Sequence, residues 1–231
     1  MGRAKKKRKA KAKAKRYKQI SLGKAVRFVL SNSPKKYQGC CNRYSYQSNI
    51  HNLIYVGASF VNDKFQNCTI TSCNFRNATL TDIYFAHCNL KGTSFKNVAL
   101  TNVTFFDCKM QSANFENAIM NNVTFIRMNL NTIRNLPDEG YNIVNSYPKI
   151  DNEKLLFNAL LLSNHNSFYK YHVLNISKTK VNNWYLQLLL THYENDEDVS
   201  RGLYALNIRK DRRGFITIAS YMRFLDRYLK I

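Results

Sequence analysis

Residues 78–97 read ATLTDIYFAHCNLKGTSFKN, and the same five-residue pattern continues on both sides of this stretch. Every fifth residue from Tyr55 to Leu130 is large and apolar. A small or medium residue lies two positions before most of them, with Asp63 as the plain polar exception, and Asn, Asp, Ser or Gly usually follows two positions after. A period of five fits neither a helix nor a simple strand. The pattern predicts short strands joined by bends, repeated as a β-solenoid.

The repeated unit has a recognisable consensus. The units ATLTD at 78–82 and ANFEN at 113–117 fit the form A(D/N)LXX. Over about residues 50–132 the sequence resembles the pentapeptide-repeat family. The resemblance implies a right-handed, four-sided β-helix with four pentapeptides in each coil, and so about four coils of twenty residues. We therefore expect a mainly β fold that also has a disordered basic N-terminal tail and a C-terminal α-helical segment.

A coil of twenty residues would place side chains twenty positions apart directly over one another. Two interior columns of rings are expected on opposite sides, one formed by Phe65, Phe85, Phe105 and Phe125 and the other by Phe75, Phe95 and Phe115. Cys68, Cys88 and Cys108 share a third column. Parallel side chains in a column point alike, so we interpret these cysteines as small core residues and not as a disulfide or a metal site.

The positive charge is concentrated near the N-terminus. The chain has 231 residues and a formal net charge of +22, and 16 of its 36 Lys and Arg precede Asp63, the first acid. Lys and Arg release counterions from phosphate groups without needing a fold, so the tail is a candidate for nucleic-acid contact. The candidate residues are Arg3, Lys5, Lys6, Lys7, Arg8, Lys9, Lys11, Lys13, Lys15 and Arg16. A nuclear or nucleolar address and a solubilising tail are the alternatives.

Composition and breaker residues divide the chain into five parts. We expect a basic tail at 1–18, a capping segment at 19–49, the solenoid at 50–132, a linker at 133–150 and an α-helical domain at 151–231. Helices are predicted at 18–31, 151–166, 183–195, 198–209 and 214–230. The last of these has an apolar stripe. The stripe predicts either a helical bundle that caps the solenoid or a homodimer interface through the C-terminal helices.

Two further features are candidates for contact surfaces. Phe106 and Ile126 occupy equivalent outward positions one coil apart. An exposed apolar pair predicts that the C-terminal helices or a partner protein dock on that face, and we take both as candidate partner-binding residues. The segment 209–213, with the sequence RKDRR, is a second basic cluster that we interpret as a solvated loop or a phosphate contact.

The sequence offers little support for catalysis or metal binding. It contains no nucleophile elbow, Walker loop, HExxH or dinucleotide fingerprint. Cys40, Cys41 and His51 lack the paired spacing of a structural zinc site, and the acidic segment 192–198 is interpreted as a loop before a helix. We expect no enzyme, catalytic residue, metal or cofactor. No apolar run reaches the ~18 residues that span a bilayer, so we expect no membrane span.

Some members of the resembled family bind DNA gyrase by mimicking duplex DNA, or protect it from quinolones. Such mimicry needs an acidic rod, whereas residues 63–136 carry seven basic and four acidic side chains. The leading hypothesis is a cytoplasmic, non-enzymatic interaction scaffold whose solenoid binds an unidentified protein partner and whose tail contacts nucleic acid. The alternatives are an effector or viral protein with a nuclear or nucleolar targeting tail, and a topoisomerase (gyrase)-interacting protein.

Overall fold

The corners of the solenoid show why this sequence bends every five residues. A computed structural model describes Lys7, Ala10, Lys11, Ala14 and residues 29–193 and 195–230. Corner residues such as Asn62, Asn77 and Asp82 have left-handed backbones, with φ of 53°, 58° and 59°. Asn and Asp tolerate this conformation because their short side chains bond the local backbone. Between corners the chain is extended for three or four residues.

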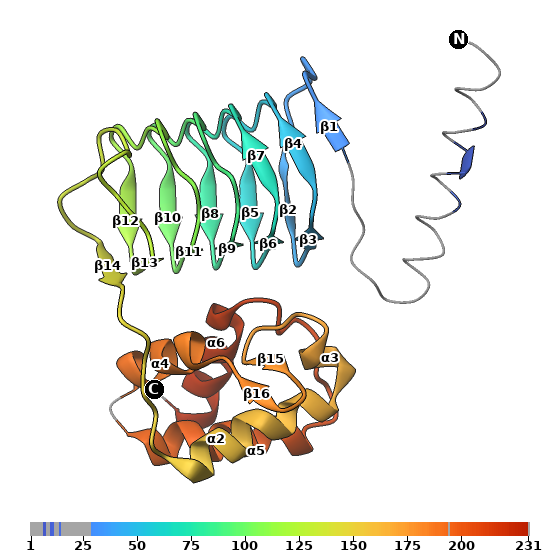
Figure 1. Ribbon diagram of the computed structural model, residues 1–231, viewed down its shortest axis with the longest axis vertical. Coiled ribbons are helices and arrows are strands. Elements are labelled where there is room, and N and C mark those ends of the chain that lie inside the picture. Colours follow the sequence, from blue (N-terminus) through green and yellow to red (C-terminus); the bar gives the residue numbers. More distant parts are fainter. Residues whose placement is uncertain (1–6, 8–9, 12–13, 15–28, 194, 231) are drawn as a thin grey trace.

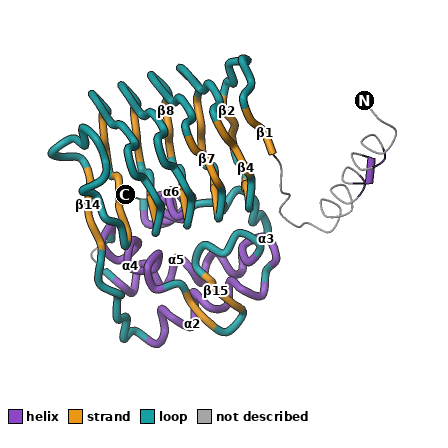
Figure 2. Tube along the Cα trace, turned by 45° about the horizontal axis from the view of Figure 1, so that its top comes forward, coloured by secondary structure: helices purple, strands orange, loops and turns teal. Residues whose placement is uncertain are grey.

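The solenoid consists of short parallel strands stacked in walls (Figures 1 and 2). The strands are β1 Val29–Ser31, β2 Gly39–Cys41, β3 Tyr44–Tyr46, β4 Asn49–His51, β5 Ser59–Val61, β6 Lys64–Gln66, β7 Thr69–Thr71, β8 Thr79–Thr81, β9 Tyr84–Ala86, β10 Ala99–Thr101, β11 Thr104–Phe106, β12 Ile119–Asn121, β13 Val123–Ile126 and β14 Tyr141–Val144. Three walls are sheets with the orders β1-β4-β7, β12-β10-β8-β5-β2 and β14-β13-β11-β9-β6-β3. The fourth wall, which we call the bridge wall, is joined by isolated parallel bridges such as Ile54–Asn74.

The register confirms the coil of twenty residues. Phe65 is paired with Phe85, and Phe85 with Phe105. Their rings stack with centroids 5.1 Å and 5.2 Å apart, and Phe125 continues the column at 5.3 Å. The second column, formed by Tyr55, Phe75, Phe95 and Phe115, has centroid separations of 4.8, 5.3 and 4.8 Å. Both columns are buried, as the alternation of ring and aliphatic positions predicts.

The cysteine column packs as part of the core. Cys68 and Cys88 are buried and Cys108 is half-buried. The Cys88 thiol donates to the Phe65 carbonyl at 3.3 Å, one coil away, and burial raises the pKa of this thiol. The polar exception, Asp63, is also fully buried, and its carboxylate accepts from Cys40 Sγ at 3.0 Å and from the Arg43 amide at 2.6 Å.

The solenoid is longer at both ends than the repeat pattern indicated. β1, β2 and β3 add a coil before residue 50, and β14 pairs with β13 beyond residue 132, so there are about five coils instead of four. The first coil was missed because small residues, Cys40 and Ser45, stand in register with Phe60 and Phe65. The helix predicted at 18–31 is wrong for residues 29–31, which form β1, and its remainder lies outside the described residues.

Residues 151–230 form a helical domain beside the solenoid (Figure 1). Its elements are α2 Glu153–Leu161, the 3-10 helix η1 Leu162–Asn164, α3 Asn166–Tyr169, the hairpin β15 Asn175–Ser177 and β16 Lys180–Val181, α4 Asn183–His192, α5 Asp196–Ile208 and α6 Ile218–Leu229. The helix predicted at 151–166 corresponds to α2, η1 and the start of α3. The helices predicted at 183–195, 198–209 and 214–230 correspond to α4, α5 and α6, whereas the hairpin was not predicted. The apolar stripe of α6, including Tyr221 and Leu225, is buried in the core of the domain. No helix among the described residues is both long and apolar enough to cross a membrane.

Candidate interaction surfaces

One wall of the solenoid is covered by the helical domain (Figures 1 and 2). This covered wall is the sheet that contains β9, β11 and β13, in which inward and outward residues are both buried. Phe106 is 8% exposed and Ile126 is 0% exposed, and the Phe106 ring lies 5.9 Å from Trp184 and 6.3 Å from Tyr185. The chain's own helical domain therefore covers the face that these two residues were predicted to mark.

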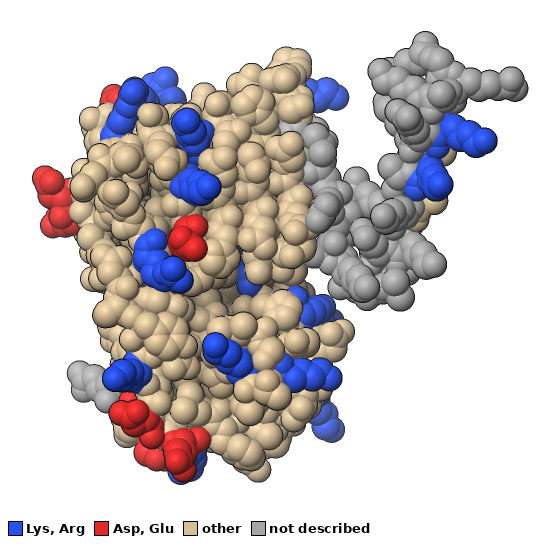
Figure 3. All heavy atoms as spheres, in the orientation of Figure 1, with Lys and Arg blue, Asp and Glu red and all other residues tan. Residues whose placement is uncertain are grey.

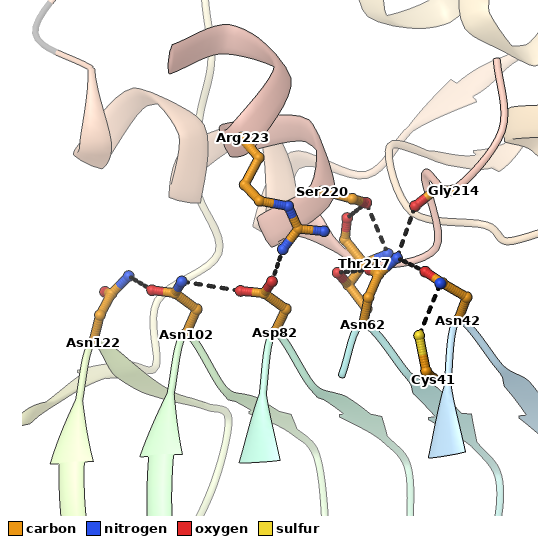
Figure 4. Close-up of polar contacts among 10 residues, drawn as sticks. All are labelled: Cys41, Asn42, Asn62, Asp82, Asn102, Asn122, Gly214, Thr217, Ser220 and Arg223. Carbon is orange, nitrogen blue, oxygen red and sulfur yellow. Dashed lines mark hydrogen bonds and ion pairs between the residues drawn. The ribbon is translucent and has the colours of Figure 1, made fainter. Parts of the chain in front are cut away.

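A ladder of corner side chains fixes the edge of the covered wall (Figure 4). The ladder consists of side chains at twenty-residue spacing, namely Asn42, Asn62, Asp82, Asn102 and Asn122. Asn62 donates to Asn42, Asn102 donates to Asp82, and Asn122 donates to Asn102. Two members of the ladder also reach the helical domain. Since a carboxylate replaces an amide at Asp82 alone, only this position offers the ladder a negative charge.

Asn62 and Asp82 make the polar contacts to the helical domain. The Asn62 amide donates to the Gly214 carbonyl at 2.9 Å and accepts from the Thr217 hydroxyl at 2.8 Å. The buried Asp82 carboxylate forms an ion pair with Arg223 of α6. These contacts position the start of α6 and its second turn on the solenoid. In the sequence, Asp82 stands out as an acid at a position where the other coils have Asn. Nothing in the sequence indicated that Arg223 would be its partner.

Lys64 is buried where the covered wall meets the helical domain. Its ammonium donates to the carbonyls of Tyr171 and, at 3.3 Å, His172, and it lies 4.9 Å and 5.4 Å from the ring centroids of Tyr84 and Tyr44. Among the described residues no acid forms an ion pair with it. Burial lowers the pKa of Lys64 to about 7, since the charged form loses its water. Sequence reasoning missed this residue because an outward Lys in a solenoid normally faces solvent.

The open walls differ in chemistry. The wall formed by β2, β5, β8, β10 and β12, which we call the uncharged wall, has no charged residue in its strands. It exposes Val61 and Ile119, at 38% and 71%. The bridge wall lies opposite the covered wall and carries Arg76, Lys96 and Glu116 at twenty-residue spacing, with Lys96 and Glu116 paired at 2.5 Å. Figure 3 shows Lys and Arg along the upper part of the solenoid, away from the helical domain.

The candidate metal ligands of the sequence are not gathered in one place. Cys40 lies on β2 and His51 on β4, which belong to different walls, and His51 contacts Thr71 at 2.7 Å. In the acidic segment, Asp196, Glu197 and Asp198 form the first turn of α5, where acids complement the helix dipole. Within the described ranges no group of three His, Cys, Asp or Glu side chains is arranged to hold a metal ion.

Residues 58–134 match the family pattern described as a pentapeptide repeat region. Every fifth position of this stretch points into the coil, as the pattern requires. The chain contains a pentapeptide-repeat solenoid. No curated protein matches the chain by sequence.

Three solved structures are similar to this pentapeptide-repeat chain. A trypsin-treated variant of QnrB1, a plasmid-mediated fluoroquinolone resistance protein, is 20% identical over 46% of this chain and 55% of its own, with a TM-score of 0.32. The pentapeptide repeat protein Rfr23 from the cyanobacterium Cyanothece 51142 is 12% identical over 56% of this chain and 94% of its own, with a TM-score of 0.26. Full-length QnrB1 is 13% identical over 52% of this chain and 92% of its own, with a TM-score of 0.17. The match thus spans about half of the trypsin-treated QnrB1 chain.

The tail residues predicted to contact nucleic acid fall mainly outside the described part of this pentapeptide-repeat protein. Lys7 and Lys11 are described and are exposed. Arg3, Lys5, Lys6, Arg8, Lys9, Lys13, Lys15 and Arg16 lie outside the described residues. Nucleic-acid contact by the tail therefore stays a prediction.

Proposed function

We propose that this protein is a non-enzymatic interaction scaffold, which binds a protein partner on the solenoid and nucleic acid through its basic tail. The observation that carries the proposal is that the helical domain covers one wall and leaves the uncharged wall open. That wall presents short side chains in rows set by the stacked strands, and its exposed Ile119 and Val61 are the kind of residues that protein interfaces bury. Because the walls are hydrogen-bonded from coil to coil, this surface is pre-organised for a partner.

The partner surface predicts a specific loss of binding. Replacing Ile119 by Lys should abolish capture of the partner, because it places a charge on an uncharged contact surface. The fold should be preserved, since the side chain is 71% exposed. The measurement is a pull-down after nuclease treatment, which removes proteins bridged by nucleic acid. Phe157→Lys, an exposed position on α2 that is 61% accessible, is the matched control and should retain the same proteins. Retention by Ile119→Lys as well would refute the proposed wall.

The tail proposal predicts a change in salt dependence. Deleting residues 1–18 removes the ten basic side chains between Arg3 and Arg16, and also Lys18. Affinity for nucleic acid should fall, and the slope of log K against log salt should flatten by about 0.9 for each phosphate of duplex DNA that the tail neutralises. A tail of the same composition in shuffled order is the control, because counterion release depends on charge and not on order. Unchanged affinity and slope after the deletion would contradict the anchor.

Two alternative functions have direct tests. The run Lys5–Lys9 supports a nuclear or nucleolar address in a eukaryotic cell. A fusion of the tail to a fluorescent protein should then concentrate in the nucleus, whereas uniform cytoplasmic fluorescence would favour the anchor.

Interaction with a topoisomerase is the other alternative. A gyrase supercoiling assay with no inhibition and no protection from quinolone would dismiss it.

A homodimer through the helical domain is a separate proposal, with a different surface from the one the sequence indicated. Most of the stripe of α6 is buried, so it is not free to pair with a second copy. On the helices, exposed large apolar side chains include Phe157 on α2, Tyr204 and Ile208 on α5 and Tyr228 on α6, at 61%, 51%, 63% and 43%. Sedimentation velocity over a range of protein concentrations decides between monomer and dimer.

A further inference from the structure

The helical domain has ends of opposite charge. α5 begins with Asp196, Glu197 and Asp198, and the loop 209–213 that follows it has four basic residues and one acid. α2 runs beside α5 in the same direction, since Lys154 pairs with Glu197 at 2.7 Å and His165, after α2, pairs with Asn207 at 2.9 Å. Figure 3 shows acids gathered at the lower left of this domain and Lys and Arg towards its right side.

Three segments meet at the basic end, which we define as residues 163–180 and 207–214: η1 with α3, the hairpin of β15 and β16, and the loop 209–213. The Ser163 hydroxyl, in η1, donates to the Lys178 carbonyl at 3.3 Å, which holds the hairpin against the end of α2. Across these segments the basic residues are Lys170, Lys178, Lys180, Arg209, Lys210, Arg212 and Arg213, and the only acid of the sequence there is Asp211. The basic end therefore has a net charge of +6, seven cations less one anion.

A hollow lies within the basic end, lined by Ser167 and residues 210–213. Arg212 donates from Nη2 to the Asn207 carbonyl at 2.8 Å, while its Nε is buried and has no hydrogen-bond partner among the described residues. Arg213 is held by Asp211, with Nε 3.0 Å from the carboxylate. Ser167, Lys210 and the two arginines thus supply hydrogen-bond donors around the hollow, and the Asp211 carboxylate beside them is already bonded to Arg213. Phosphate oxygens accept hydrogen bonds only and carry negative charge, so they match this set of donors.

The loop that lines the hollow is attached to the solenoid. Gly214 directly follows it and accepts from Asn62 in the second coil, and the Arg209 guanidinium lies over the Phe224 ring at 5.4 Å. The first coil begins at Val29, the point at which the segment carrying the basic tail joins the solenoid. Figure 1 shows β1 and α3 on the same side of the molecule. The basic end therefore lies at the end of the solenoid from which the tail sequence extends.

We propose that the basic end of the helical domain, centred on the hollow lined by Ser167 and residues 210–213, binds the phosphate backbone of nucleic acid as a second contact beside the tail. This inference rests on the proposed function, since tail and basic end would hold the same strand or duplex. Seven cations on three segments exceed what one phosphate group can contact, so a polymer of phosphates fits the surface better than a single phosphorylated side chain. Backbone contacts position a protein without reading bases, so binding is independent of sequence.

The test compares two double variants of the full-length protein with the same change in charge. Lys210→Gln with Arg213→Gln removes two cations beside the hollow, whereas Lys149→Gln with Lys154→Gln removes two near the acidic end. All four side chains are exposed. Fluorescence anisotropy with a short DNA duplex of mixed sequence should show Kd raised about tenfold at about 50 mM salt for the first pair. The salt slope should be flatter by about 2, so this difference should nearly disappear at about 200 mM. The second pair should stay within about twofold of the unchanged protein.

Each outcome decides one point. Equal behaviour of the two double variants, with unchanged circular dichroism, would overturn the second contact even if deletion of residues 1–18 abolishes binding. If the tail deletion has no effect while the hollow variant binds tenfold more weakly, the tail anchor fails and the basic end stands as the contact. Single-stranded RNA in place of duplex DNA shows which nucleic acid is preferred. A hollow variant that loses binding to phosphatidylserine vesicles but keeps its affinity for both nucleic acids would assign the surface to membranes and refute the proposal.

Discussion

Phe95→Ala should lower the free energy of unfolding by about 3–5 kcal/mol, the cost of emptying a ring-sized site in a packed core. Phe95 is 0% exposed and is stacked between Phe75 at 5.3 Å and Phe115 at 4.8 Å, with the edge of Phe105 at 6.3 Å. Because the neighbouring coils are hydrogen-bonded on both sides, they cannot collapse into the space. Urea denaturation followed by circular dichroism gives the change directly.

Two further variants make the ring-column prediction decisive. Phe157→Ala removes the same ring from a position that is 61% exposed, so it should cost less than about 0.5 kcal/mol. Phe95→Leu keeps an apolar side chain in the column and provides a folded protein for measurement if the alanine variant does not fold. Equal stability of Phe95→Leu, Phe157→Ala and the unchanged protein would show that the interior columns do not carry the stability of the solenoid.

The second large effect is a pH dependence that depends on Lys64. In the folded protein burial lowers the pKa of Lys64 to about 7, whereas in the unfolded chain it is about 10.4. Between these values the unfolded chain binds a proton that the folded protein does not, so Lys64 destabilises the fold progressively as pH falls. The effect is about 1.4 kcal/mol for each pH unit between about 10 and about 7, and it is constant below that range.

Lys64→Met isolates this contribution. It keeps a long side chain beside Tyr44 and Tyr84 and removes the titrating group, so its stability relative to the unchanged protein should rise as pH is lowered from about 10 to about 7. Cysteine and tyrosine groups that titrate in the same range are common to both proteins, so they cancel in the difference. Lys91→Met, on the exposed surface of the solenoid, should show no such trend. Parallel stability curves for Lys64→Met and the unchanged protein would contradict a buried, readily neutralised Lys64.

The ends of the solenoid show where sequence periodicity stops being informative. The first coil keeps the backbone register but places Cys40 and Ser45 at positions where later coils have large apolar residues, so the predicted solenoid begins one coil too late. At the other end, residues 133–150 were predicted to be a linker. Gly140, with a φ of 86°, instead makes a further corner, where a Cβ atom would lie 2.1 Å from the Met120 carbonyl oxygen, and β14 follows it.

The covered wall was anticipated in part. Phe106 and Ile126 indicated the face on which something docks, because two large apolar residues one coil apart are unlikely to face water. The polar contacts that hold the helical domain there were not anticipated. Lys64, for example, is one of several outward basic residues in the repeats, and nothing near it in the chain marks it as buried.

The coil of four units, and the interior columns that follow from it, came from the family resemblance. Periodicity alone was enough to establish the inward side chains and the corners, because each five-residue unit specifies its own inward side chain and its own bend. Those properties are local, and the stacking of coils repeats them. The placement of the helical domain depends instead on pairs such as Lys64 with Tyr171, Asn62 with Gly214 and Asp82 with Arg223, which are more than 100 positions apart. Outward side chains are free to vary in a solenoid, so only the folded structure decided which of them are buried and which remain open to a partner.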